Sequence, residues 1–302
     1  MKCTRCTLGT LAVLIAHLLA GPAEARRRHR KPVPKGPPPA RVEDDPRRKG
    51  DDKAFAKAAI KFTAPADLSQ LDPALPVHIE LDVTGYAIGA LKPGSPVPHA
   101  HLIVDNEPAV EVDEGHAVLS LTGLTRGPHL MRAILCRPWH EVVKAPHAFA
   151  MVRFWIGQKL EGKAGKAAEF VAWPDPKKAI LTYVLPIGER AKDAPRLVIG
   201  HEVQQQPDAA SPESTDPLPA SAPGGDRPVL DFYLANARVA RRGDKIRIVL
   251  DRRELPLITD WKPQHLRRAR GGTHKVTIDI LNRKGLKVKN AVNRTDRVFT
   301  IH

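Results

Sequence analysis

Short runs that alternate between apolar and polar residues recur from about residue 60 to the end of the chain, with turn-forming residues between them. The clearest are VHIELDV, HAHLIVD, AVLSL, HLMRAIL and VRFWI, and later DFYLANA, KIRIVLD, HKVTIDI and RVFTI. A period of two is typical of a strand with one buried face. Many short strands separated by turns predict an all-β fold of antiparallel, immunoglobulin-like sandwiches.

The two groups of runs repeat one another in the same order. GPHLMRAILCR, which begins at Gly127, corresponds to GTHKVTIDILN, which begins at Gly272. A repeat of this length is a whole domain, so we predict two tandem sandwiches, residues 54–158 and 179–302, with a linker over 159–178. The alternative is chance similarity between two β-rich segments. His129 and His274 precede a strand in both copies, and we expect them to have a structural role.

The first 25 residues have the features of a secretory signal peptide. Lys2 and Arg5 precede an apolar stretch, Leu8 to Ala20, and small residues follow it at Ala23 and Ala25. The stretch is shorter than the roughly 20 residues of a membrane-spanning helix. We therefore expect export to the periplasm or the extracellular space, with no transmembrane span in the mature chain. The alternative is an uncleaved membrane anchor.

Two segments have compositions that cannot bury a core. Residues 26–53 are rich in Arg, Lys and Pro, and residues 201–228 are rich in Pro, Ala, Ser and acidic residues. We expect the first to be a disordered basic tether and the second to be a disordered insertion in the second sandwich.

The chain is strongly basic, with 48 Lys and Arg against 33 Asp and Glu and a formal net charge of +15. A field of this sign attracts anionic surfaces. We therefore expect the partner to be an anionic component of the cell envelope or another exported protein. Nucleic acid is not expected, because the chain is exported and aromatic residues for base stacking are scarce.

Comparison of the copies predicts which side chains point outward from one strand. In KIRIVLD the apolar residues form the inward set, so Lys245 and Arg247 point outward. The matching strand, HAHLIVD, then projects His99 and His101 from its outer face, about 7 Å apart. The inward residues of both strands are Ala100, Leu102, Val104, Ile246, Ile248 and Leu250.

A third histidine follows in the loop CRPWHEVVKAPH, which we expect to lie near the start of that strand. A His-x-His pair with a further histidine is a suitable ligand set for zinc or copper. We therefore take His99, His101 and His140 as candidate metal ligands. The alternative is a set of exposed histidines without a ligand. Cys136 matches Leu281 in the second copy, and we expect it to be a small apolar filler.

The function that we predict first is non-catalytic binding of an anionic ligand or surface. Its candidate residues are Trp139, Glu141 and Lys144 in this loop, together with Lys245 and Arg247 in the second copy. We predict no enzyme, because the chain has no Gly-x-Ser-x-Gly, no Gly-rich phosphate loop and no His-Glu-x-x-His.

HAHLIVDNEP, the Arg-Gly-x-His corner and RPWHEVVK resemble motifs of a group of uncharacterised exported bacterial proteins with tandem immunoglobulin-like repeats. The second half of the resemblance lies in the Asp-Phe-Tyr-Leu strand from Asp231 and the Trp-Lys-Pro turn from Trp261. It covers about residues 60–302 and implies export and metal binding by the His-x-His strand. It implies no activity, and it does not extend to the insertion from His201.

Overall fold

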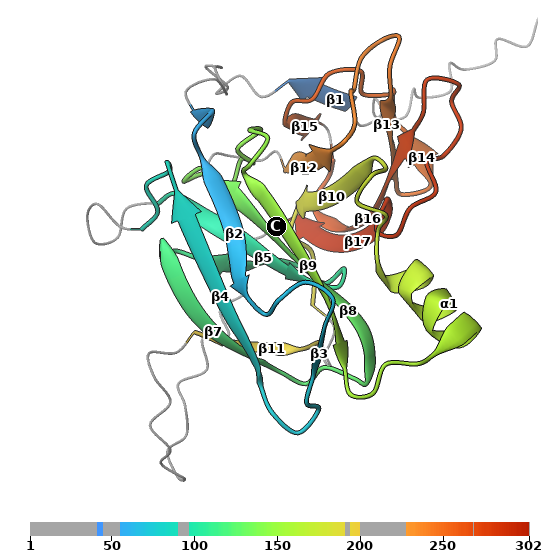
Figure 1. Ribbon diagram of the computed structural model, residues 1–302. Coiled ribbons are helices and arrows are strands. Elements are labelled where there is room, and N and C mark those ends of the chain that lie inside the picture. Colours follow the sequence, from blue (N-terminus) through green and yellow to red (C-terminus); the bar gives the residue numbers. More distant parts are fainter. Residues whose placement is uncertain are drawn as a thin grey trace, which may run out of the picture. The chain divides into compact units, whose positions relative to one another are not determined.

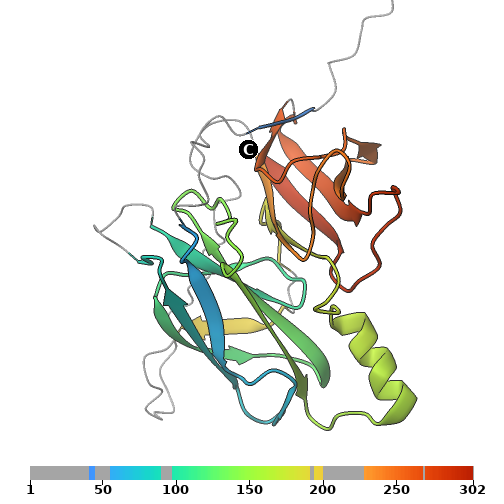
Figure 2. The same cartoon turned by 45° about the horizontal axis from the view of Figure 1, so that its top comes forward.

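A computed structural model describes residues 41–44, 55–89, 97–190, 194–199, 228–267 and 269–301. The first sandwich consists of two facing sheets (Figures 1 and 2). One sheet has the order β11 (Arg196–Ile199), β7 (His116–Thr122), β4 (Val77–Thr84) and β2 (Ala59–Ala64). The other has the order β3 (Ser69–Leu71), β9 (Phe149–Ile156), β8 (Gly127–Cys136), β5 (His99–Val104) and β6 (Val110–Val112).

The second sandwich repeats this arrangement. One sheet has the order β1 (Arg41–Asp44), β15 (Gln264–Arg267), β12 (Val229–Ala235) and β10 (Ile180–Leu185). The other has the order β14 (Arg253–Glu254), β13 (Lys245–Leu250), β16 (Gly272–Leu281) and β17 (Arg294–Ile301). The predicted fold class, two tandem immunoglobulin-like sandwiches, is confirmed.

The two copies share the same local bonding around one histidine. In the first copy, Asp105 accepts a bond from the Leu130 amide and pairs with His129 Nδ1 at 2.9 Å, while His129 Nε2 lies 2.7 Å from the Thr125 carbonyl. In the second copy, His274 Nδ1 lies 2.7 Å from Asp251, and His274 Nε2 contacts a carbonyl four residues earlier. The histidine therefore fixes the turn before β8 and before β16, as expected.

Strand β5 is buried on both faces, whereas its counterpart β13 alternates between buried and half-buried residues. The inner face of β5 faces the core of the first sandwich. Its outer face is covered because the loop 137–148 folds back, and because β10 and β12 of the second copy contribute Val184, Val229 and Tyr233 to the same apolar cluster.

The predicted domain boundaries need correction in two places. Residues 41–44, expected in the disordered tether, form β1 and pair with β15 of the second sandwich. Residues 196–199, expected in the second domain, form β11 and pair with β7 of the first. The expected linker contains helix α1 (Gly162–Ala172), which packs on the first sandwich through Trp155 and Trp173.

The predicted signal peptide, most of the predicted tether and the predicted insertion up to residue 227 lie outside the described residues. Within the described part of the chain, no helix combines the length and the hydropathy needed to cross a membrane.

Candidate metal centre

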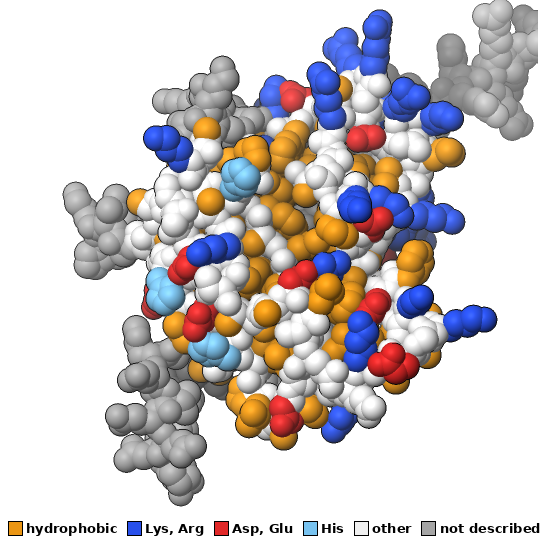
Figure 3. Space-filling model, in the orientation of Figure 1, with side chains coloured by type: hydrophobic (Ala, Val, Ile, Leu, Met, Phe, Trp, Pro, Cys, Tyr) orange, Lys and Arg blue, Asp and Glu red, His pale blue; other side chains and the backbone are white. Residues whose placement is uncertain are grey.

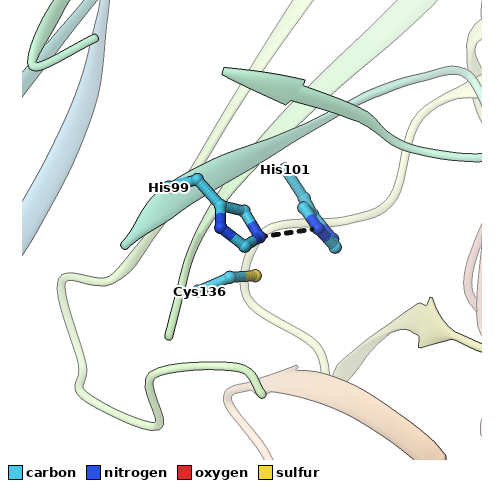
Figure 4. Close-up of side chains that lie close together, drawn as sticks. All are labelled: His99, His101 and Cys136. Atoms are coloured by element: carbon cyan, nitrogen blue, oxygen red, sulfur yellow. Dashed lines mark hydrogen bonds between the residues drawn. The ribbon is translucent and has the colours of Figure 1, made fainter. Parts of the chain in front are cut away.

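The structure brings the three predicted histidines together. His99 and His101 lie on the outer face of β5, and His140 reaches them from the loop after β8. His99 Nε2 is 3.1 Å from His101 Nε2 (Figure 4), and His101 Nε2 is 3.3 Å from His140 Nδ1. The predicted face is right, but the predicted exposure is wrong: the three residues are 0%, 0% and 8% exposed. Loop 137–148 and the second copy cover that face.

Two of the three nitrogen separations are close to those between the ligands of a coordinated ion. A tetrahedral ion with metal–nitrogen bonds of about 2.0–2.1 Å holds its ligand nitrogens about 3.3 Å apart. The observed separations are 3.1 and 3.3 Å. The possible ligand atoms of His99, His101 and Cys136 lie within 4.8 Å of one another, as do those of His99, Glu111 and His140, so the three imidazoles would have to shift to share one ion.

The facing ring nitrogens cannot all be paired by hydrogen bonds among themselves. The carbonyl of Val97 lies 2.8 Å from His99 Nδ1, so that nitrogen carries the proton and His99 Nε2 presents a lone pair toward His101. His101 Nε2 faces two ring nitrogens, and one proton can serve only one of them. His101 Nδ1 is buried with no hydrogen-bond partner among the described residues. An ion at the centre would satisfy the facing lone pairs together.

The environment favours neutral imidazoles, which is the form that binds metals. Burial lowers the pKa of His99 and of His140 below the usual value. Burial, followed by the neighbouring His99 and His140, lowers the pKa of His101 well below it. All three rings can therefore offer lone pairs at neutral pH.

Two further residues join the cluster. Cys136 lies directly opposite His99 in the β5–β8 ladder, and its sulfur lies within 4.8 Å of the ligand atoms of His99 and His101. Glu111 on β6 lies 3.2 Å from His99 Nδ1 and groups with His99 and His140. A carboxylate on the far nitrogen of a ligating histidine orients the ring.

The sequence analysis missed Glu111 as a partner and assigned Cys136 only to the core. Cys136 is fully buried, as expected of a filler, yet it also faces the imidazoles. Burial raises the pKa of its thiol well above the usual value. Period-two alternation could have found Glu111, because Glu111 pairs opposite His101 in the β5–β6 ladder.

His140 has a left-handed backbone, with φ of 62°. The amide of His140 donates to the Arg137 carbonyl, and in the second copy the amide of Gly285 donates to the Asn282 carbonyl, both at 2.8 Å. Gly285, the counterpart of His140, has φ of 78°. Glycine adopts this conformation freely, whereas a side chain makes it unfavourable. The first copy thus places a histidine where the fold suits glycine.

The second copy serves as an internal comparison for the whole cluster. The registers of the β5–β8 and β13–β16 ladders show that Lys245 is the equivalent of His99, Arg247 of His101 and Leu281 of Cys136. Glu111 corresponds to Leu257, because Val112 bonds opposite Ala100 as Ile258 does opposite Ile246. The same fold forms without any of these metal-binding side chains. The cluster therefore adds chemistry that the sandwich itself does not need.

The loop that carries His140 is fixed to the second copy by a buried ion pair. Lys144 Nζ lies 3.0 and 3.1 Å from the two carboxylate oxygens of Asp231, and the Val142 amide donates to the same carboxylate at 2.9 Å. Burial raises the pKa of Asp231, and Lys144 opposes that rise. Strand β12 thus positions the metal-facing loop.

The predicted anion-binding residues of this loop are engaged within the protein. Lys144 pairs with Asp231, and Trp139 Nε1 donates to Glu141 at 2.9 Å. Glu141 is buried beside Arg137. This placement corrects the expectation that Trp139, Glu141 and Lys144 face an external ligand.

Lys245 and Arg247 lie on the predicted face of β13, opposite Ile246, but both are half-buried. Arg247 pairs with the buried carboxylate of Asp279, and Lys245 Nζ lies 3.3 Å from the Gly243 carbonyl. They lie on β13 of the second copy, whereas Trp139, Glu141 and Lys144 lie in the loop after β8 of the first, and all five are engaged within the protein.

The chain matches no family model, and no curated protein matches it. Among solved structures it is similar to fibronectin(III)-like modules of Clostridium thermocellum CbhA, with 6% identity, a TM-score of 0.22, and 80% of this chain and 93% of that chain covered. It is also similar to a putative membrane anchored protein from Corynebacterium diphtheriae, with 10% identity, a TM-score of 0.24, and 80% and 57% covered. A third is the Bacteroides ovatus mixed-linkage glucan utilization locus protein SGBP-B in complex with a heptasaccharide, with 12% identity, a TM-score of 0.19, and 80% and 70% covered.

Proposed function

We propose that this chain is an exported, non-catalytic metal-binding protein whose first sandwich holds one zinc or copper ion between His99, His101 and His140. The observation that carries the proposal is the convergence of three buried imidazoles, two from β5 and one from the loop after β8, with nitrogen separations of 3.1 and 3.3 Å. Their replacement by Lys245, Arg247 and Gly285 in the second copy supports it.

The buried ligand set favours a structural metal site over a catalytic one. Structural metal sites are closed, whereas catalytic sites keep one position open to water or substrate. Here the three histidines and Cys136 are buried, so the ion would be enclosed by protein. Imidazole with a thiol suits zinc and copper better than magnesium or calcium, which prefer oxygen ligands.

Competition titration with zinc and with copper tests the proposal. The purified protein should bind one equivalent of at least one of the two metals. A His99→Ala/His101→Ala double variant should lose at least about a hundredfold in affinity, because two of three ligands are gone. The matched control is His78→Ala/His116→Ala, which removes two exposed histidines from the other sheet of the same sandwich and should bind as the wild type does.

Cobalt binding distinguishes the loss of metal ligands from the loss of the fold. A protein loaded with Co²⁺ should show the visible absorption of a tetrahedral ion, and the double variant should lose it while keeping its far-ultraviolet circular dichroism. Failure of zinc, copper and cobalt to bind the folded wild-type protein would remove the proposal.

A further inference from the structure

Helix α1 presents the two most exposed large apolar side chains of the described chain. Phe170 is 79% exposed and Val171 is 78% exposed, and they adjoin each other near the end of the helix. Leu160, just before the helix, is 51% exposed. The opposite side of α1 is buried at Gly165 and packs near Trp155 and Trp173. The helix is therefore anchored on one side and displays apolar groups on the other.

Lysines surround these apolar groups. Lys163 and Lys166 lie on the exposed part of α1, and Lys177 and Lys289 are exposed nearby. None of the four forms an ion pair with a described carboxylate, whereas Glu169 is already paired with Lys159 at 2.6 Å. Figure 3 shows basic, acidic and hydrophobic side chains side by side over α1. The surface of α1 thus carries lysines without carboxylate partners among the described residues, and Glu161 is the exposed acidic residue at the start of the helix.

A groove of about 570 Å³ runs beside the helix. Phe170 forms part of its wall, and Lys166 and Lys289 contribute positive charge to its lining. The carboxylates of Glu169 and Asp175 also line the groove, and each is paired with a lysine. The groove is held in shape by Asn290, which accepts a bond from the Asp175 amide at 2.8 Å and donates to the Asp175 carbonyl at 3.2 Å. An anionic group bound there would lie next to the exposed apolar pair.

We infer that α1 is a membrane-docking element that inserts Phe170 and Val171 into the interfacial region of an anionic phospholipid bilayer, with Lys163, Lys166 and Lys289 on the headgroup phosphates. Surface helices that combine apolar residues with lysines bind membranes in this way. Anionic lipid attracts each nearby lysine, and the apolar side chains supply a contribution that salt does not screen.

The size of the patch favours a bilayer over a protein partner. A stable protein–protein interface buries about 800 Å² on each side. Two adjoining apolar side chains and Leu160 are too few for the apolar centre of such an interface, but they suffice for a wedge among lipid headgroups. The anionic surface would then be bound by α1 and not by the predicted loop residues. This binding does not depend on the proposed metal site.

Vesicle co-sedimentation of the full chain tests the inference. We expect binding to vesicles of phosphatidylcholine mixed with phosphatidylglycerol and little binding to phosphatidylcholine alone. Phe170→Ser/Val171→Ser should weaken binding about tenfold or more, because the free energy gained when Phe170 enters the bilayer is lost. Lys163→Gln/Lys166→Gln should also weaken it and reduce its dependence on salt.

The controls change exposed residues of the same types in the second sandwich. Leu257→Ser/Leu286→Ser and Lys275→Gln/Lys284→Gln should bind vesicles as the wild type does. If both α1 variants bind as tightly as the wild type, vesicle binding belongs to another basic part of the chain and the inference is wrong. It is also wrong if α1 is needed for binding an acidic polypeptide such as polyglutamate while the protein ignores vesicles.

Discussion

His140 shows at the scale of one residue how the site is built on the fold. Its left-handed backbone is disfavoured for a side chain by about 1–2 kcal/mol, and glycine has no such cost. Strained positions of this kind cluster at functional sites, where the surrounding structure holds them in place. Its turn is closed by the same backbone bonds as the turn at Gly285. The imidazole is therefore held toward His101 by a turn that both copies share.

Exchange of the two turn residues tests this account. His140→Gly should leave the stability of the metal-free protein within about 1 kcal/mol, because relief of the backbone offsets the lost ring. Zinc should no longer raise the unfolding midpoint of that variant. Gly285→His should destabilise the protein by about 1 kcal/mol without adding a metal equivalent. Chemical denaturation with and without zinc measures both. A zinc-dependent stabilisation that survives in His140→Gly would contradict the role of His140.

A second residue-scale prediction concerns His129. Burial acts to lower the pKa of His129, but the hydrogen bond and charge of Asp105 outweigh it and raise the pKa above the usual value. A raised pKa means that the folded state binds the proton more tightly than the unfolded state does. This stability is therefore fully present below about pH 6.5, the pKa of an unperturbed histidine, and is lost as pH rises through the raised pKa.

Asp105→Asn should flatten that pH dependence. Urea midpoints measured across the interval above about pH 6.5 should fall with pH less steeply in the variant than in the wild type. Asp251→Asn is the matched change in the second copy, where Asp251 likewise raises the pKa of the more exposed His274. Its effect should have the same sign and be smaller, because solvent screens that pair. An unchanged slope in both variants would show that these histidines do not link protonation to folding.

At the scale of elements, the loop after β8 connects the metal centre to the second sandwich. The same loop supplies His140 to the cluster and Lys144 to the buried carboxylate of Asp231. Removing one partner of a buried ion pair leaves an uncompensated charge, at a cost of about 3–5 kcal/mol. The position of the loop therefore depends on β12 as well as on β8.

Lys144→Met should lower the free energy of unfolding by about 3–5 kcal/mol and weaken metal binding through the displaced loop. Lys289→Met, the matched change at the exposed counterpart in the second copy, should change stability by less than about 0.5 kcal/mol. Calorimetric unfolding followed by zinc titration measures both effects. Equal stability of the two variants would mean that the buried pair does not fix the loop.

At the scale of the whole molecule, strand parity made the fold and part of the site predictable. Alternation in KIRIVLD identified the face of His99 and His101 correctly, since the matching strand has the same register. Their burial could not be predicted, because loop 137–148 folds back over that face and is fixed there by Asp231 of β12 in the second copy. Period two within one strand carries no information about which distant segment packs against it.

The pairing of β1 and β11 could not be predicted from local sequence patterns for the same reason. Residues 41–44 and 196–199 each pair with the sandwich other than the one that their sequence position suggests. Pairing of short edge strands depends on which sheet edge is free in the folded molecule. Glu111 was recoverable from the sequence in principle, because the β5–β6 ladder places it opposite His101.

Metal content of the protein purified from its native compartment, without added metal or chelator, tests the central claim most directly. The account predicts about one equivalent of zinc or copper per chain, lost in His99→Ala/His101→Ala and kept in His78→Ala/His116→Ala. Less than about a tenth of an equivalent in the folded wild-type protein, or equal metal content in the two double variants, would contradict it.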